Sequence, residues 1–140
     1  MVIALGSDHA GFYLKEKIKA YLSNKGFEAK DFGTDSDKPC DYPDYAKQVA
    51  GAILKEKYHF GILICGTGIG MSIAANRIPG IRAALCYTEE FAHLARKHNW
   101  ANILCLSGRF LKEKDACKIV DAFLSSQPED RHRMRIEKLG

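Results

Sequence analysis

The chain has 140 residues, of which 46% are hydrophobic and 27% charged, which suits one domain over residues 1–140 with a hydrophobic core. No apolar stretch approaches the roughly 20 residues that cross a bilayer, which argues against a membrane-spanning segment. The net charge of +4 is mild. It suits a small anionic substrate better than a nucleic acid, which favours a broader basic surface.

The first half of the chain alternates between strand and helix patterns. Residues 2–7 form an apolar run typical of a buried strand, and residues 27–33 alternate like a strand nearer the edge of a sheet. Residues 60–65 are continuously apolar, which indicates a central parallel strand covered on both faces. The intervening helical faces carry Leu14, Ile18, Tyr21 and Leu22 in a helix ended by Gly26, then Tyr45, Val49, Ala52 and Ile53.

The second half continues this alternation. A short helix over about 71–76 follows a glycine-rich turn, and residues 81–86 and 101–107 predict two further strands. Thr88 suits the N-cap of the helix between these strands. The helical faces here carry Phe91, Leu94 and Ala95, then Ala116, Ile119, Val120, Phe123 and Leu124, before a basic segment at about 128–140.

Alternating strands and helices predict right-handed βαβ units and a parallel sheet between helix layers. We therefore expect an α/β fold, a Rossmann-like three-layer α/β/α sandwich with a five-stranded parallel sheet. Ligands of such sheets bind beyond the carboxyl ends of the strands. The residues that follow the first and third strands are thus the first candidates for a site.

Cys65 ends the third predicted strand, and Asp8 and His9 follow the first. Backbone N–H groups of a glycine-rich turn at a helix N-terminus bind anions, and the same positive field lowers a thiol pKa. Cys65 is therefore a candidate base or nucleophile. Packing alone stays an alternative for Cys65, an N-cap for Asp8 and a surface position for His9. The turn contains Gly66, Thr67, Gly68 and Gly70.

Other chemistries fit the sequence poorly. The glycine turn lacks the spacing of a dinucleotide or Walker loop, and Met71 stands where cysteine phosphatases need arginine. The five cysteines form no CxxC pair, and without an export signal they suit reduced thiols in a cytoplasmic protein. We expect Cys86, Cys105 and Cys117 to pack. The histidines are scattered, so no metal is expected.

His98 and Asn99 follow the fourth predicted helix and precede the last strand, which puts them at the amino edge of the sheet. If they are catalytic, they must serve a neighbouring subunit, and the protein must be an obligate dimer. A helix C-cap and a turn are the alternative functions of this pair.

The basic tail places Arg131, Arg135 and Lys138 on one helical face by their i, i+4, i+7 spacing. They could form a phosphate clamp, which Arg109 after the last strand could join. A solvated basic face is the alternative. Nucleic-acid binding has less support, because the segment is short and lacks interleaved aromatic residues.

Six segments in this order carry a family resemblance, and they cover nearly the whole chain. They are GSDHAG, DYPDYA, GILICGTGIGMSIAANR, GIRAAL, ARKHN and DRHRMR. They resemble the type B family of ribose-5-phosphate isomerases, which also includes galactose-6-phosphate and allose-6-phosphate isomerases. Some members of that family have serine where this chain has Cys65.

The resemblance implies a Rossmann-like fold, no cofactor, and a homodimer or dimer of dimers whose active sites are shared across the interface. It implies isomerisation of ribose 5-phosphate to ribulose 5-phosphate through an enediol, with Cys65 moving the proton between C1 and C2. Asp8 and His98 would handle ring opening, with His98 supplied by the partner. The sugar and the enediolate oxygen would be held by Gly66, Thr67, Gly68, Gly70 and Asn99. Tyr42 would line the sugar pocket, and the phosphate would be bound by His9, Arg109, Arg131 and Arg135.

Two other functions stay open. A hexose-6-phosphate isomerase of the same family would differ in pocket length, which the sequence does not reveal. A non-catalytic sugar-phosphate-binding module would have no need for the base at Cys65.

Overall fold

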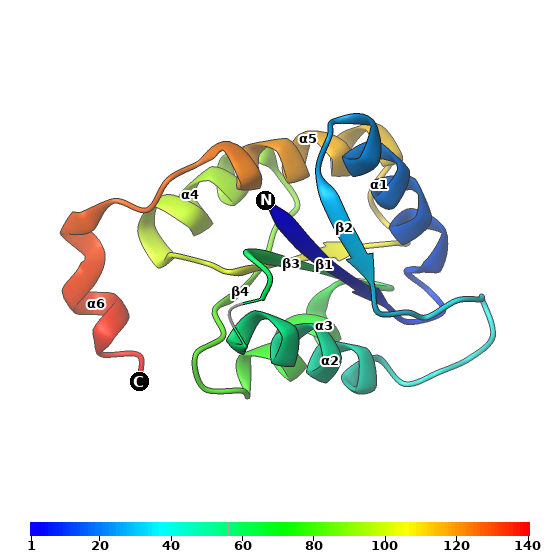
Figure 1. Ribbon diagram of the computed structural model, residues 1–140, viewed down its shortest axis with the longest axis horizontal. Coiled ribbons are helices and arrows are strands. Elements are labelled where there is room, and N and C mark those ends of the chain that lie inside the picture. The colour runs from blue at the N-terminus through cyan, green and yellow to red at the C-terminus, as the bar shows by residue number, and fades with distance from the viewer. Residues whose placement is uncertain (56) are drawn as a thin grey trace.

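The structure, a computed structural model, describes residues 1–55 and 57–140 (Figure 1). Its strands form one five-stranded sheet in the order β2-β1-β3-β5-β4, and every neighbouring pair is parallel. The predicted parallel α/β fold is confirmed, with β3 at the centre and β2 at an edge. The strands are β1 (Val2–Ser7), β2 (Glu28–Asp31), β3 (Phe60–Cys65), β4 (Ala83–Leu85) and β5 (Ile103–Ser107).

Helices cover both faces of this sheet, which confirms the three-layer arrangement (Figure 1). One face is covered by α1 (Phe12–Asn24), α4 (Glu89–Asn99) and α5 (Glu113–Ser125). The other is covered by α2 (Tyr42–Leu54) and α3 (Ile69–Asn76). The chain then ends in the 3-10 helix η1 (Asp130–His132) and α6 (Arg133–Glu137), which lies apart from the sheet in Figure 1.

The central strand explains why residues 60–65 are continuously apolar. Successive side chains of a strand point to opposite faces. Ile62 and Ile64 pack in the core beneath α1, α4 and α5, whereas Leu63 and Cys65 pack in the core beneath α2 and α3. Burial of each large aliphatic side chain contributes roughly 1.5–3 kcal/mol, so both faces anchor the strand and fix the position of Cys65 at its end.

Several element boundaries differ from the predicted ones. The edge strand β2 ends at Asp31 rather than residue 33, although the Phe32 N–H still donates to the Leu5 carbonyl (2.9 Å). Helix α3 begins at Ile69, two residues earlier than predicted, because the Ser72 N–H already bonds the Gly68 carbonyl (3.1 Å). The predicted N-cap is confirmed, since the Thr88 hydroxyl accepts the Phe91 N–H.

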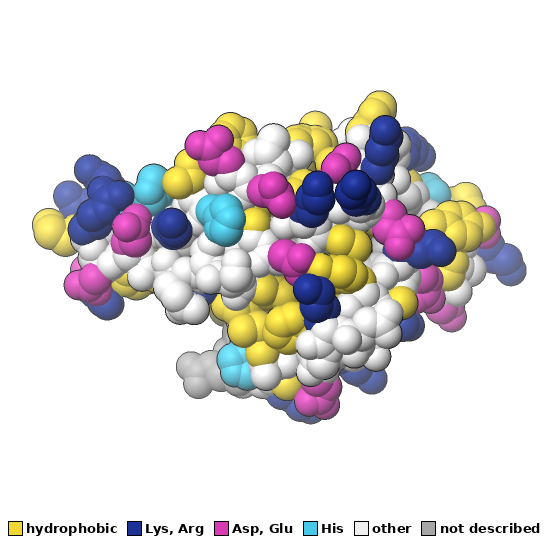
Figure 2. Space-filling model, turned by 90° about the horizontal axis from the view of Figure 1, so that it is seen from above, with side chains coloured by type: hydrophobic (Ala, Val, Ile, Leu, Met, Phe, Trp, Pro, Cys, Tyr) yellow, Lys and Arg dark blue, Asp and Glu magenta, His cyan; other side chains and the backbone are white. Residues whose placement is uncertain are grey.

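The end of α4 also corrects the sequence analysis. His98 and Asn99 form the last turn of this helix rather than following it. The residue that makes the turn is Trp100, whose φ of 52° lies in the left-handed region, and not Asn99. Lys and Arg side chains gather beyond this point, at the C-terminal end of the molecule (Figure 2).

Within the described residues, no helix is both long and apolar enough to cross a membrane.

Gly11 allows the start of α1 to pack directly on the central strand. A Cβ at this position would lie only 2.4 Å from the Ile64 carbonyl oxygen, which is backbone and cannot move aside. We expect Gly11→Ala to lower the free energy of unfolding by about 1–3 kcal/mol through overpacking. Urea denaturation of the wild type and the variant measures this difference in the free energy of unfolding.

Gly51 provides the matched control. It lies within α2, and a Cβ there would meet nothing within 4 Å. Gly51→Ala should therefore raise stability by about 0.5–1 kcal/mol, because alanine favours helix over glycine. Equal stability losses for the two variants would contradict the close contact at Gly11.

Candidate active site

The carboxyl ends of β1, β3 and β5 meet at one edge of the sheet. The register pairs Ser7 with Ile64 and Cys65 with Ser107. Just past the ends of the strands, the Asp8 N–H donates to the Ile64 carbonyl (3.2 Å), and the Gly108 N–H donates to the Cys65 carbonyl (2.8 Å). The backbone therefore brings Asp8 and Cys65 to the same edge.

Asp8 is held by the turn that leads into α1. Its Oδ1 accepts the N–H groups of Ala10 (3.0 Å) and Gly11 (3.1 Å), and the residue is only 6% exposed. Asp8 is not the helix N-cap considered from the sequence, because that position is Gly11 and it receives no side-chain cap bond. The two bonds instead hold the turn before α1 and fix the direction in which the Asp8 carboxylate points.

His9 contacts the loop that precedes α2. Its Nδ1 accepts the Cys40 N–H (3.2 Å), so the neutral ring carries its proton on Nε2. The ring is half-buried. Its second nitrogen is consequently a donor, as a phosphate ligand requires.

The turn after Cys65 has a fixed shape. Gly68 has a φ of +84°, and a Cβ there would lie 2.5 Å from Leu85 Cδ1, so glycine is required on two grounds. The Thr67 hydroxyl accepts the Ile69 N–H (3.1 Å), and its carbonyl accepts the Tyr87 hydroxyl (2.6 Å). Since the first turn of α3 presents N–H groups without helical partners, this edge offers a preformed anion site beside Cys65.

Arg109 and Tyr42, both predicted to contact the substrate, lie against glycines of this turn. Gly66 lies under the Arg109 guanidinium, because a Cβ on Gly66 would be 3.2 Å from Arg109 Nη1. Gly70 lies under the Tyr42 ring, where a Cβ would be 2.8 Å from Cζ. A charged donor and a phenol ring therefore border the N-terminus of α3.

Sequence reasoning missed two residues that shape this edge. The Ser107 hydroxyl donates to the Gly66 carbonyl (2.7 Å) and accepts the Phe110 N–H (3.0 Å). Ser107 could have been found, because it ends a predicted strand as Cys65 does. Tyr87 lies between β4 and α4, and no spacing in the sequence pairs it with Thr67.

Three other cysteines have thiols whose pKa is raised. Burial raises the pKa of Cys86 to about 11 and raises that of Cys105 further, with the neighbouring cysteines adding to it. Burial also raises the pKa of Cys117, helped by Glu113 and Asp121. These thiols stay protonated near neutral pH, which fits packing residues.

His98 and Asn99 lie at the opposite edge. They precede β5, whose first residue Ile103 pairs with Gly61 near the start of β3. His98 Nε2 lies 3.5 Å from Glu129 Oε1 and 3.5 Å from Arg131 Nη2, and its ring is 4.6 Å from that of His132. Within one chain His98 therefore lies away from Cys65. The sequence analysis predicted this separation, because it placed the two residues at opposite edges of the sheet.

The basic tail does not form the single helical face that its spacing suggested. Arg131 lies in η1 and Arg135 in α6, because a 3-10 turn interrupts the helical spacing after Pro128. Arg131 Nη2 donates to Glu129 Oε1 (3.2 Å), and Arg135 Nη1 lies 3.4 Å from His132 Nδ1. Both arginines are exposed at the C-terminal end, where basic and acidic side chains mingle (Figure 2).

The same cluster offers ligand atoms for a metal. Possible ligand atoms of His98, Glu129 and His132 lie within 4.8 Å of one another. Sequence reasoning passed over Glu129 and His132. However, Arg131 already binds the glutamate oxygen, and its positive charge opposes a cation at this place.

A pocket opens at this amino edge, between α6 and the segment that leads into β4. Its lining includes Ile78, Arg82, Asn99, Ile136 and Leu139. The pocket does not include Asp8 or Cys65. The residues predicted for one reaction thus form two groups on opposite edges of the sheet.

Comparison with known proteins identifies the family. The model of the ribose/galactose isomerase family matches residues 3–139. The chain belongs to this family. It is 48% identical over 138 residues to ribose-5-phosphate isomerase B of Escherichia coli, with 98% of this chain and 93% of that protein covered.

Solved structures agree with this assignment to the ribose/galactose isomerase family. A ribose 5-phosphate isomerase of Thermotoga maritima superposes with a TM-score of 0.97 at 57% identity, covering 99% of this chain and 96% of that one. Ribose-5-phosphate isomerase B of Clostridium thermocellum superposes with a TM-score of 0.98 at 45% identity, covering 100% and 95%. The resemblance noted in the sequence is therefore confirmed at the level of the family.

His132 gives the tail a measurable dependence on pH. Burial lowers its pKa below the ordinary 6.5, and the charges of Arg131, His98 and Arg135 lower it further, against a raising effect of Glu129. Between the folded and unfolded pKa values the unfolded chain binds more protons, so stability rises with pH there. We expect the free energy of unfolding to fall as the pH is lowered from about 7 to about 5, and less so in His132→Gln.

Urea denaturation across this range measures the slope, and NMR titration of the His132 ring measures the pKa directly. A ring titrating at or above its ordinary value, with equal slopes for the two proteins, would contradict the effect of burial.

Proposed function

We propose that this protein is an aldose–ketose isomerase that interconverts ribose 5-phosphate and ribulose 5-phosphate. The observation that carries the proposal is the placement of Cys65 beside Asp8 and in front of the glycine turn, with Arg109 over Gly66. The names of the relatives support the same activity.

The proposed reaction proceeds through an enediolate. A base must remove a proton next to a carbonyl, and it works best with a pKa near the working pH. The proposed base is the Cys65 thiol, which ends β3 just before the turn into α3, and no metal or cofactor is proposed. The N–H groups of the turn, with Thr67, would stabilise the developing negative charge.

Phosphate binding would orient the sugar over Cys65. His9 carries a donor at Nε2, and Arg109 presents its guanidinium above Gly66. Contacts to a phosphate that does not react supply binding energy for orienting the reacting carbons. Tyr42, against Gly70, would then line the sugar chain.

A partner subunit would complete the site. His98, Asn99, Arg131 and Arg135 lie at the other edge, so they reach a Cys65 only in a second copy. We infer a homodimer, alone or as a dimer of dimers, in which Asp8 and the partner's His98 handle ring opening. A cytoplasmic location fits reduced thiols, and neither a nucleic acid nor a membrane is among the proposed partners.

Turnover tests the proposal directly. We expect the wild type, with EDTA present, to form ribulose 5-phosphate from ribose 5-phosphate, and Cys65→Ala to lose about 10²- to 10⁴-fold in kcat. Binding of ribose 5-phosphate, measured by calorimetry, should be largely retained. Cys117→Ala is the control, since this thiol lies on α5, and it should keep full activity.

Other outcomes would change the function. Retained turnover in Cys65→Ala would exclude this thiol as the base. If the wild type does not turn over ribose 5-phosphate, allose 6-phosphate and galactose 6-phosphate are tested as substrates, because the family includes galactose isomerases. Silence there as well would leave a sugar-phosphate-binding module.

Mixing two inactive variants tests the shared site. We expect Cys65→Ala and His98→Ala chains, after subunit exchange, to recover about a quarter of the wild-type activity. Random association makes half of the dimers mixed, and one of the two sites in each mixed dimer is then intact. Mass spectrometry verifies the exchange. Mixed dimers without activity would overturn the proposed site shared between subunits.

A further inference from the structure

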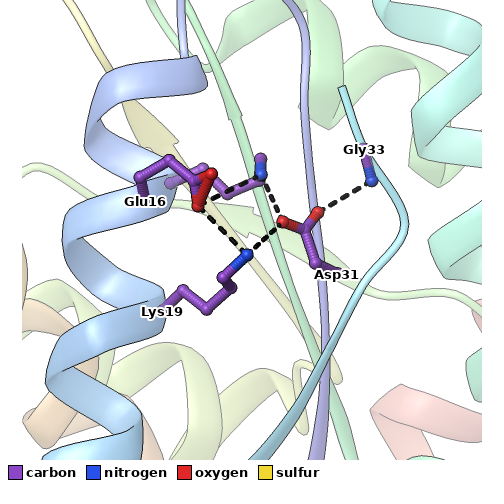
Figure 3. A network of polar contacts seen from close by, with 5 residues as sticks. Glu16, Lys19, Asp31 and Gly33 are labelled. Carbon is purple, nitrogen blue, oxygen red and sulfur yellow. Dashed lines mark hydrogen bonds and ion pairs between the residues drawn. The ribbon is translucent and has the colours of Figure 1, made fainter. Parts of the chain in front are cut away.

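Lys15 is a charged side chain without exposure to solvent. It lies on α1 and is 0% exposed, and its Nζ lies 2.5 Å from Asp31 Oδ2 at the end of β2 (Figure 3). Lys19 reaches the same oxygen from the surface (2.9 Å), and Glu16 lies 3.8 Å from Lys15. Desolvation makes a buried ion pair a weak source of stability, so its presence calls for another explanation.

The second oxygen of Asp31 leads to the candidate site. Oδ1 accepts the Gly33 N–H (2.8 Å), which Figure 3 shows beside the ion pair. The Gly33 carbonyl accepts the Ser7 N–H (2.7 Å), and the Ser7 carbonyl accepts the Thr34 N–H (2.8 Å). Ser7 is the last residue of β1 and directly precedes Asp8. An unbroken series of hydrogen bonds therefore joins the ion pair to the backbone of the site.

We propose that Lys15 and Asp31 are positioning residues, which hold the turn at Gly33 and Thr34 and thereby fix Asp8 and His9 for the reaction. Asp31 acts at the backbone through Oδ1, and Lys15 fixes the orientation of the carboxylate through Oδ2. Neither residue touches the substrate. The proposal rests on the proposed function for its kinetic test only.

The charge state of Asp31 fits this function. Burial raises its pKa, but hydrogen bonds from Lys15, Lys19 and the Gly33 N–H outweigh burial, and the net pKa is lowered. The carboxylate thus stays charged and accepting at neutral pH. Lys19 shares this carboxylate but is 43% exposed, and an exposed ion pair orders its partner little.

Two double variants separate positioning from stability. Lys15→Met/Asp31→Asn removes both charges but keeps an oxygen for the Gly33 N–H. Lys15→Met/Asp31→Leu removes that oxygen as well, at similar side-chain volume. We expect the Leu variant to lose about tenfold or more in kcat on ribose 5-phosphate with a smaller change in KM, and the Asn variant, which lacks Lys15 but keeps the acceptor, to lose less.

A substrate-independent measurement accompanies the kinetics. Amide hydrogen exchange at Ser7 should stay slow in the Asn variant and become faster in the Leu variant. A silent wild type would overturn the proposed function and leave this measurement as the test of positioning. Equal kcat values in the two variants, or equal exchange at Ser7, would overturn the positioning.

Single variants cover the case in which a double variant does not fold. Lys15→Met and Lys19→Met each remove one cation from the same carboxylate, and Asp31 remains. We expect kcat to fall in Lys15→Met and to stay at the wild-type value in Lys19→Met, with melting temperatures measured for both. Equal kcat values in these two would likewise overturn the proposal.

Discussion

The backbone hydrogen bonds between parallel strands are the constraint on which the candidate site depends. Because Ser7 pairs with Ile64, and Cys65 with Ser107, the chain leaves three strands at one level of the sheet. The loops that follow these strands are then close enough to form hydrogen bonds with neighbouring strand ends, as the Gly108 N–H does with the Cys65 carbonyl. A thiol, a carboxylate and a helix N-terminus meet there although they are distant in sequence.

Close packing of these loops sets strict limits on side-chain size. A Cβ at Gly108 would lie 2.6 Å from the Ala10 carbonyl oxygen, and a Cβ at Gly68 would strike Leu85. The glycines after the strands thus have a steric function besides presenting N–H groups. The same closeness means that a displacement of one loop reaches the others, which is why a buried ion pair behind β1 can matter at Asp8.

Patterns along one element could be predicted from the sequence, and contacts across elements could not. Continuous apolar residues over β3 predicted its central place, and the strand-end rule predicted that Asp8 and Cys65 lie at one edge of the sheet, which the structure confirms. The contacts of Tyr87 with Thr67 and of Lys15 with Asp31 were not predicted. Each joins two elements whose relative position only the fold determines. Spacing also misled at Arg131, since helical periodicity assumes one continuous helix and a 3-10 turn precedes α6.

The arginines of the second group already make polar contacts within the chain. Arg131 Nη2 donates to Glu129 and Arg135 faces His132, so a phosphate bound at the proposed shared site would compete with these contacts. Such competition is weak for exposed pairs, whose net energy in water is roughly 0–1 kcal/mol. A phosphate accepts from guanidinium through two parallel bonds and carries more charge than one carboxylate. The internal contacts therefore do not hold the arginines against a stronger anion, as the proposed site shared with a second subunit requires.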